Sequence, residues 1–124
     1  SQIATAEENS FTVQIYGEDG CFKWNQENPN YLYQLMEGKP IQILKPGNSY
    51  LSDFSLKSSK LPPGHPEGFF DAMGNIYNGV AKTLREVETN DGSYPSINEG
   101  VRGMMFIEKV LESNKNGNIW TKLD

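Results

Sequence analysis

The sequence predicts an α+β fold, in which an antiparallel meander sheet carries two amphipathic helices packed on one of its faces. Three observations lead to this prediction. The first part of the chain alternates apolar and polar residues over short runs, which is typical of half-buried strands. The second part repeats apolar residues at steps of three and four, which is typical of helices. The 124 residues, of which 36% are hydrophobic and 22% charged, suit one small domain with one core.

The first strand pair is expected at the start of this region. FTVQIY at 11–16 alternates, GEDG at 17–20 has the composition of a hairpin turn, and CFKWNQ at 21–26 alternates again. ENPN at 27–30 is expected to be a corner, because Asn28 precedes a proline and is pushed out of helical space. The side of the first strand that is expected to face the helices carries Phe11, Val13 and Ile15.

A second strand pair follows. YLYQLM at 31–36 and IQIL at 41–44 are joined by EGKP, and connections this short require antiparallel neighbours. The stretch 45–60 is rich in serine and has no apolar period, which predicts a long surface loop.

The first helix is expected over 66–84, with Pro66 at its first position, where a missing N–H costs nothing. A loop over 88–95 then leads to a second helix that begins at Ser96. SINE has the spacing of a capping box, and Lys115 and Gly117 are typical of a helix end. IWTKL at 119–123 predicts a short final strand. The apolar stripe of the first helix comprises Phe69, Met73, Ile76, Tyr77, Val80 and Leu84.

Several functions are not favoured by the composition. A net charge of −5 argues against a general nucleic-acid surface, and no apolar run is long enough to span a membrane. The chain has no glycine-rich phosphate loop, no nucleophile motif and no zinc-type spacing of cysteine and histidine. Its one cysteine, Cys21, allows no internal disulfide, which fits a reducing compartment such as the cytoplasm. We therefore expect no catalytic, cofactor-binding or metal-binding residue in this chain.

Three motifs, in order, resemble one enzyme family. The first segment, EENSFTVQIYGEDGCFKWNQENPNYL, has a strand, a turn, a G-x-F-x-W strand and a Q-E-x-P-N corner. The second, LPPGHPEGFFDAMGNIY, has the pattern G-H-P-E-G-F, and the third, EGVRGMMFIEKVLESNKNGNIWTKL, leads a Gly-x-Arg into a helix and a G-x-W end. Together they resemble the C-terminal domain of the Gfo/Idh/MocA oxidoreductases, the glucose–fructose oxidoreductase and inositol dehydrogenase family. The matching positions are Ile15, Tyr16, Gly17, Gly20, Phe22, Trp24, Gln26, Glu27, Pro29, Asn30, Gly64, His65, Pro66, Glu67, Gly68 and Phe69.

The resemblance implies a division of labour. Members of this family carry an N-terminal Rossmann domain that binds NAD(P), and a catalytic lysine and an Asp/His pair precede the region that resembles this chain. The expectation is therefore that residues 1–124 are a fragment of the C-terminal substrate and oligomerisation domain, without the Rossmann domain. NAD(P) is implied for the parent protein, which is expected to be an enzyme, whereas the chain alone is not.

His65 is the candidate substrate-binding residue. In one interpretation Gly64 turns the chain, Pro66 starts the helix and His65 fills a cap-like position. In the other, the imidazole donates to or accepts from a substrate hydroxyl. The residues alone favour the first interpretation, whereas the resemblance supports the second, because the helix entrance of the family lies on the side that faces the cofactor domain.

Other polar and aromatic residues have simpler explanations. Trp24 and Tyr31 could stack on a sugar ring, but Trp24 alternates with Phe22 into the expected core. Asn28 and Asn30 are expected to shape the corner around Pro29 through bonds from side chain to backbone. Close approach to the sheet would explain the glycines of the first helical pattern, Gly68, Gly74 and Gly79.

The second sheet face is polar with little charge. It is either an ordinary solvent face or a flat surface for self-association, and the resemblance favours self-association into a dimer, because family members pair through the open face of this sheet. An unpaired edge near Ile3 and Phe11 would add to this surface. The residues assigned to the polar face are Thr12, Gln14, Tyr16, Lys23, Asn25, Gln34 and Gln42.

Two functions follow from these observations. The leading hypothesis is the C-terminal substrate-binding and oligomerisation part of an NAD(P)-dependent oxidoreductase that acts on a sugar, polyol or glycoside. The alternative is a stand-alone binding or assembly domain without chemistry of its own. Neither hypothesis involves nucleic acid or a membrane.

Overall fold

The computed structural model describes residues 3–85 and 92–123. Contacts divide the chain into two units, 1–75 and 76–124, with the boundary inside the second helix. The predicted α+β class is confirmed by a four-stranded sheet and three helices in the described residues. In chain order the elements are β1 (Thr12–Tyr16), β2 (Gly20–Asn25), β3 (Leu32–Met36), β4 (Gln42–Leu44), α1 (Asp53–Ser58), α2 (Phe69–Leu84) and α3 (Ile97–Lys115).

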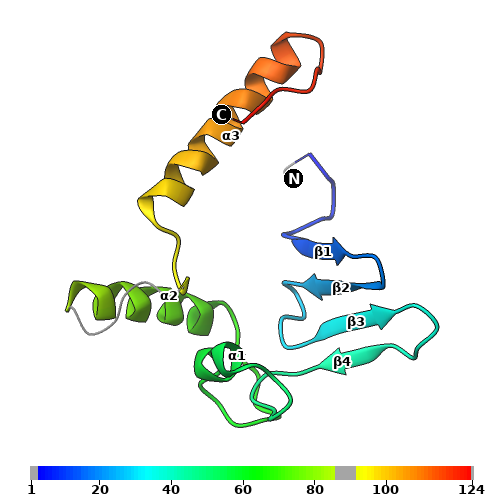
Figure 1. Ribbon diagram of the computed structural model, residues 1–124, viewed down its shortest axis with the longest axis vertical. Coiled ribbons are helices and arrows are strands. Elements are labelled where there is room, and N and C mark those ends of the chain that lie inside the picture. Colours follow the sequence, from blue (N-terminus) through cyan, green and yellow to red (C-terminus); the bar gives the residue numbers. More distant parts are fainter. Residues whose placement is uncertain (1–2, 86–91, 124) are drawn as a thin grey trace. The chain divides into compact units, whose positions relative to one another are not determined.

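The strands form one antiparallel meander in the order β1-β2-β3-β4, as predicted (Figure 1). The first hairpin is closed by the amide of Gly17, which donates to the carbonyl of Gly20 at 2.8 Å. The short connections determine this topology, because they leave no room for a crossover.

Strand register defines one apolar side of the sheet, which we call the Trp24 face. Val13 pairs with Trp24 and Ile15 pairs with Phe22, and directly paired residues point to the same side. The apolar side predicted for β1 therefore continues into β2. By register the Trp24 face carries Val13, Ile15, Phe22, Trp24, Leu32, Gln34, Met36, Gln42 and Leu44.

The opposite side, which we call the Gln14 face, differs from its prediction. Gln34 pairs with Phe22 and with Gln42, so both glutamines lie on the Trp24 face, and their assignment to the polar face was wrong. The reason is that a shift of one residue in the pairing of two strands moves each side chain to the opposite face of the sheet. The corners between the strands determine this pairing. The Gln14 face consists of Thr12, Gln14, Tyr16, Cys21, Lys23, Asn25, Tyr33, Leu35 and Ile43.

The Trp24 face is open within the unit that contains the sheet. Phe11, Val13 and Ile15 are 54, 37 and 63% exposed, and no described residue of the chain is fully buried. The packing of the two amphipathic helices on this face therefore stays a prediction.

The stretch 45–60 contains a helix, so its prediction as a long loop was wrong. The Ser52 hydroxyl caps α1 by accepting from the amide of Ser55 at 3.3 Å, with Asp53 in the first turn and Lys57 in the last. Both charges suit the helix dipole. Serines that usually indicate a loop here serve as caps, and Asn75 of α2 ties the helix end by donating to the carbonyl of Ser58 at 2.7 Å.

The start of α2 lies at Phe69, three residues later than the predicted start at Pro66. The first helical bond runs from the amide of Ala72 to the carbonyl of Gly68 at 3.1 Å. Asp71 reaches back and accepts from the amide of Gly68 at 2.8 Å. Pro66 instead lies between the helix and the turn that His65 closes.

The start and end of α3 agree with the prediction. Ser96 caps the helix and Glu99 completes the capping box by accepting from the Ser96 amide at 2.8 Å. Gly117 follows the end of the helix with φ +87°, the left-handed conformation that glycine adopts without strain. Of the predicted loop over 88–95, residues 92–95 are neither helix nor strand, and residues 88–91 lie outside the described residues.

The final strand predicted over 119–123 is not formed, so this prediction was wrong for the described residues. A strand needs a partner to bond its backbone groups, and here the carbonyl of Ile119 accepts instead from the Ser113 hydroxyl of α3 at 2.6 Å. Within the described part of the chain, no helix has both the length and the apolar character to cross a bilayer.

Candidate functional site

His65 lies in a tight turn and not in a helix cap. Its amide donates to the carbonyl of Pro62 at 3.2 Å, and Gly64 has φ +88°, which favours glycine. The His65 side chain is exposed. The helix-cap interpretation of this residue is therefore wrong, because α2 begins four residues further on.

The ring of His65 has a defined tautomer in this turn. Nδ1 lies 3.2 Å from the carbonyl oxygen of Pro62, and a carbonyl oxygen can only accept a hydrogen bond. Nδ1 therefore carries the proton of this bond. In the neutral ring Nε2 then has a lone pair, and the exposed imidazole can accept a hydrogen bond from a hydroxyl.

Glu67 closes the base of the loop that contains His65. One carboxylate oxygen, Oε1, accepts from the backbone amides of Lys60 and Leu61, each at 2.6 Å. The carboxylate thus joins the two ends of the stretch 61–66. Hydrogen bonds to a charged acceptor are shorter and stronger than neutral ones, so this contact defines the loop.

Asn30 holds the same loop from the strand side. Its Nδ2 donates to the carbonyl of Glu67 at 2.8 Å, and its Oδ1 accepts from the amide of Glu67 at 2.9 Å. The side-chain amide thereby pairs with the backbone of Glu67 as a neighbouring strand would. Because these backbone groups are occupied, Glu67 does not join α2, which accounts for the late start of that helix.

The corner at 27–30 is shaped by a residue that the prediction did not include. The side chain of Asn25 accepts from the amide of Glu27 at 2.8 Å, a local turn that asparagine favours. The predicted role of Asn30 is correct in kind, since it bonds backbone, but its partner is 37 residues away. An asparagine two residues before the turn was a detectable sequence signal, whereas the Asn30–Glu67 contact has none.

Trp24 and Tyr31 have structural partners. Trp24 lies edge-on to Phe11, with ring centres 6.2 Å apart, and its indole N–H donates to the carbonyl of Pro29 at 3.0 Å. The Lys45 ammonium lies over the Tyr31 ring at 5.3 Å. Both contacts favour the packing interpretation over sugar stacking.

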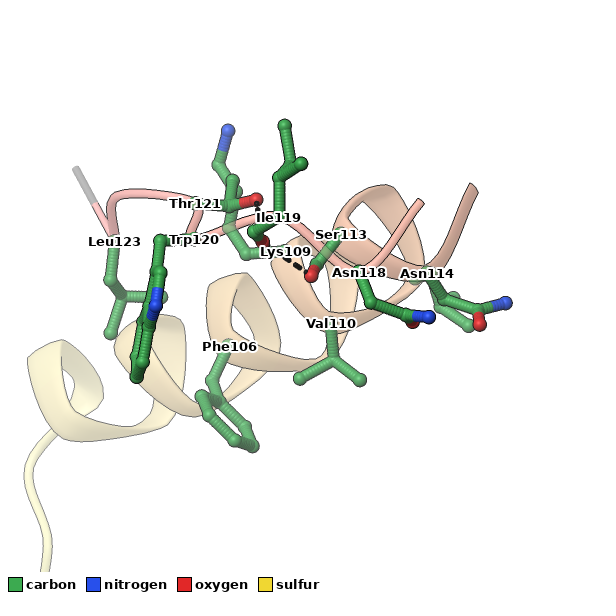
Figure 2. A pocket seen from close by; sticks show the side chains of 11 residues that line it. Phe106, Lys109, Val110, Ser113, Asn114, Asn118, Ile119, Trp120, Thr121 and Leu123 are labelled. Carbon is green, nitrogen blue, oxygen red and sulfur yellow. Dashed lines mark hydrogen bonds between the residues drawn. The ribbon is translucent and has the colours of Figure 1, made fainter. Parts of the chain in front are cut away.

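A second candidate site is an apolar groove in the unit 76–124 (Figure 2). It has a volume of about 630 Å³ and lies between α3 and the chain that returns along it. Three of its polar side chains already have partners: Ser113 and Thr121 bond the carbonyl of Ile119, and Lys109 pairs with Glu112 at 2.9 Å. The groove therefore has the character of a packing surface. Its apolar lining includes Phe106, Val110, Leu111, Ile119, Trp120 and Leu123.

The described residues contain no group of three or more His, Cys, Asp or Glu side chains placed to hold a metal ion. Cys21 is a free thiol on the Gln14 face. The chemistry that the region around His65 can perform is therefore hydrogen bonding.

Comparison with known proteins shows similarity to oxidoreductases. The chain is 32% identical over 116 residues to YfiI, an uncharacterized oxidoreductase of Bacillus subtilis (strain 168), a match that covers 89% of this chain and 30% of YfiI. No protein-family model matches the chain.

Solved structures agree with this class. An oxidoreductase from Sinorhizobium meliloti is 35% identical with a TM-score of 0.89, over 98% of this chain and 35% of that one. An inositol dehydrogenase homologue from Azotobacter vinelandii, solved with NADH and myo-inositol, is 30% identical with a TM-score of 0.89, over 98% of this chain and 34% of that one.

These matches agree with the resemblance of the chain's three motifs to the Gfo/Idh/MocA oxidoreductases. The chain spans about a third of the length of the relatives that it matches.

Proposed function

We propose that this chain is the C-terminal substrate-binding and oligomerisation part of an NAD(P)-dependent oxidoreductase that acts on a sugar, polyol or glycoside. The observation that carries the proposal is the likeness, over 98% of the chain, to an inositol dehydrogenase homologue solved with NADH and myo-inositol. In this proposal the parent enzyme transfers a hydride between a secondary alcohol carbon and the nicotinamide. The nicotinamide is held by polypeptide outside this chain, which has no phosphate-binding loop.

His65 would contribute a contact to the substrate. With its Nδ1 proton directed at Pro62, the neutral ring offers the Nε2 lone pair to a substrate hydroxyl. A polyol has hydroxyls that need acceptors once they leave water, and an exposed imidazole in a fixed turn supplies one. The proposed role of His65 is substrate binding and not catalysis, because it bonds a hydroxyl away from the carbon that exchanges the hydride.

The test uses the full polypeptide that carries this segment, with NAD+ or NADP+ and a panel of polyols that includes myo-inositol. The variant His65→Asn keeps a donor near the position of Nδ1, since the side-chain amide nitrogen lies there. It has no atom in the place of Nε2. We expect KM for the preferred polyol to rise about two- to tenfold, the cost of one neutral hydrogen bond, with kcat little changed. The matched control is Asn28→Ala, an exposed change in the nearby corner that should leave KM unchanged.

Two results would contradict this proposal. One is the absence of nicotinamide reduction with every sugar and polyol of the panel, which would favour the alternative of a binding or assembly domain. The other is an unchanged KM in His65→Asn, which would remove His65 from the substrate site.

Self-association through the Gln14 face is the second part of the proposal. The face is broad, and Tyr16 and Ile43 on it are 71 and 48% exposed. Only one of its nine members, Lys23, is charged, which suits a surface shared by two copies about a two-fold axis.

We also place the protein in the cytoplasm, since its single cysteine forms no internal disulfide.

Sedimentation velocity tests the dimer. Gln14→Lys should weaken it at least about tenfold, because the new charge lies opposite Lys23 and meets the partner copy across the axis. Gln42→Lys is the matched control, since it adds the same charge on the opposite face of the sheet. A monomeric wild type, or equal weakening by both variants, would contradict the assignment of this face.

A further inference from the structure

We propose that Glu67 is a positioning residue for His65: its carboxylate closes the loop 61–66 and thereby fixes the direction in which His65 Nε2 points. The inference rests on the proposed role of His65 in substrate binding and extends it to a residue that touches no substrate. We name the pair Glu67 and Asn30 the loop clamp.

The loop clamp bonds backbone groups at both ends of the loop 61–66. Glu67 Oε1 accepts from the amides of Lys60 and Leu61 at 2.6 Å, which fixes the beginning of the loop. Asn30 holds the backbone of Glu67 itself at 2.8 and 2.9 Å, which fixes the end of the loop to the corner after β2. Both ends of the stretch that contains His65 are therefore attached to the sheet unit.

The orientation of the imidazole follows from these attachments. The ring is held by one bond, from Nδ1 to the carbonyl of Pro62 at 3.2 Å, and Pro62 is itself inside the clamped loop. If the loop opens, the Pro62 carbonyl no longer has a defined position relative to His65. The exposed ring would then sample both tautomers and several rotamers, and Nε2 would be an acceptor only part of the time.

The effect of Glu67 therefore differs from that of a general stabilising residue. Loss of the Glu67 carboxylate should change the tautomer of His65 and weaken the binding of one substrate hydroxyl. All atoms that contact the substrate in this proposal remain present. Glu18 provides the matched control, because it is an acidic residue in the turn between β1 and β2, outside the loop and the clamp.

The first measurement is the tautomer of His65 by ring nitrogen chemical shifts, which is unambiguous because the chain has one histidine. In the wild-type chain the Nδ1-protonated form should dominate at a pH where the ring is neutral. Glu67→Ala should shift the ring toward the Nε2-protonated form that free imidazole side chains prefer. Glu67→Gln keeps an oxygen acceptor and should give an intermediate result, and Glu18→Gln should give the wild-type result. A backbone amide spectrum of each variant shows that the chain keeps its fold.

The second measurement is KM for the preferred polyol in the full polypeptide that carries the segment. Glu67→Ala should raise KM by about the same two- to tenfold factor as His65→Asn, because it withdraws the same hydrogen bond. The double variant should be no worse than either single variant, since both remove one interaction.

The outcomes separate the two proposals. If Glu67→Ala changes neither the tautomer nor KM while His65→Asn raises KM, the positioning role of Glu67 is overturned and the role of His65 is supported. If Glu67→Ala changes the tautomer while neither variant changes KM, the loop clamp is supported and the role of His65 in substrate binding is overturned. If Glu67→Ala raises KM with the tautomer unchanged, the positioning role is overturned, because the effect does not pass through His65.

Discussion

The two long helices begin in different ways, and the difference teaches which part of a fold is local. At the start of α3 a serine and a glutamate three residues apart satisfy each other's backbone groups, and no residue outside the helix takes part. At the start of α2 the backbone of Glu67 is held by Asn30, which lies 37 residues earlier. The first start was predicted to the residue, whereas the second was displaced from Pro66 to Phe69.

Proline and glycine indicated a helix start at Pro66 for a sound local reason, since proline suits the first helical position. The tertiary contact prevailed because it satisfies both backbone groups of Glu67 with a side chain of matching geometry. This displacement leaves Pro66, Glu67 and Gly68 outside the helix, between α2 and the turn that contains His65. The same contact thus decides where the helix begins.

The largest expected effect is the loss of the distant contact. Asn30→Ala should lower the free energy of unfolding of the chain by about 1–3 kcal/mol, because it leaves the partly buried amide and carbonyl of Glu67 without partners. Asn28→Ala, the same substitution at an exposed position of the same corner, is the control and should change it by less than about 0.5 kcal/mol. Urea denaturation measures both, and equal values for the two variants would show that α2 starts at Phe69 for local reasons.

The loss of the local cap should have a smaller effect. Ser96→Ala removes the side-chain acceptor at the start of α3 and should cost about 0.5–2 kcal/mol in the same measurement. Ser96→Thr keeps the hydroxyl and should recover most of this loss. If Ser96→Ala were neutral, the capping box would be a consequence of the helix and not a cause of it.

The body of α2 allows a comparison between two of its glycines. A Cβ at Gly74 meets nothing within 4 Å, so Gly74→Ala should stabilise the chain by about 0.5–1 kcal/mol through helix propensity. A Cβ at Gly79 would clash with the hydroxyl oxygen of Ser93 and lie 3.0 Å from the Tyr94 ring, so Gly79→Ala should gain less or destabilise. Thermal unfolding of the two variants checks this order, and a larger gain at Gly79 would contradict it.

The close approach expected at these glycines is therefore present at one position only. Gly68 and Gly74 have open space, and the neighbours of Gly79 come from the segment before α3. The expected close approach to the sheet is therefore wrong for Gly68 and Gly74.

The smallest expected effect is the acid response of α3. The hydrogen bonds from Ser96 hold the pKa of Glu99 below its ordinary value of 4.5. The folded pKa is thus lower than the unfolded one, so the contribution of Glu99 is present above about pH 4.5 and is lost as the pH falls through the folded pKa.

Helix content measured by circular dichroism should therefore fall slightly in this acid range. Glu99→Gln should remove the part of the transition that belongs to Glu99, whereas Glu108→Gln, in the middle of the same helix, should retain it. An unchanged transition in Glu99→Gln would exclude a contribution from the capping box.

The sequence by itself determined the elements whose signals are contained within a few residues. These are the meander, whose connections are too short for any other topology, the capping box of α3 and its glycine stop, and the motifs that resemble the Gfo/Idh/MocA oxidoreductases. Only the tertiary structure decided which side of the sheet Gln34 and Gln42 occupy, since a corner shifts the register by single residues. It also decided that 119–123 is not a strand, because a strand exists only where a partner bonds its backbone. The placement of His65 belongs to the same class, because its turn depends on a contact between residues far apart in the chain.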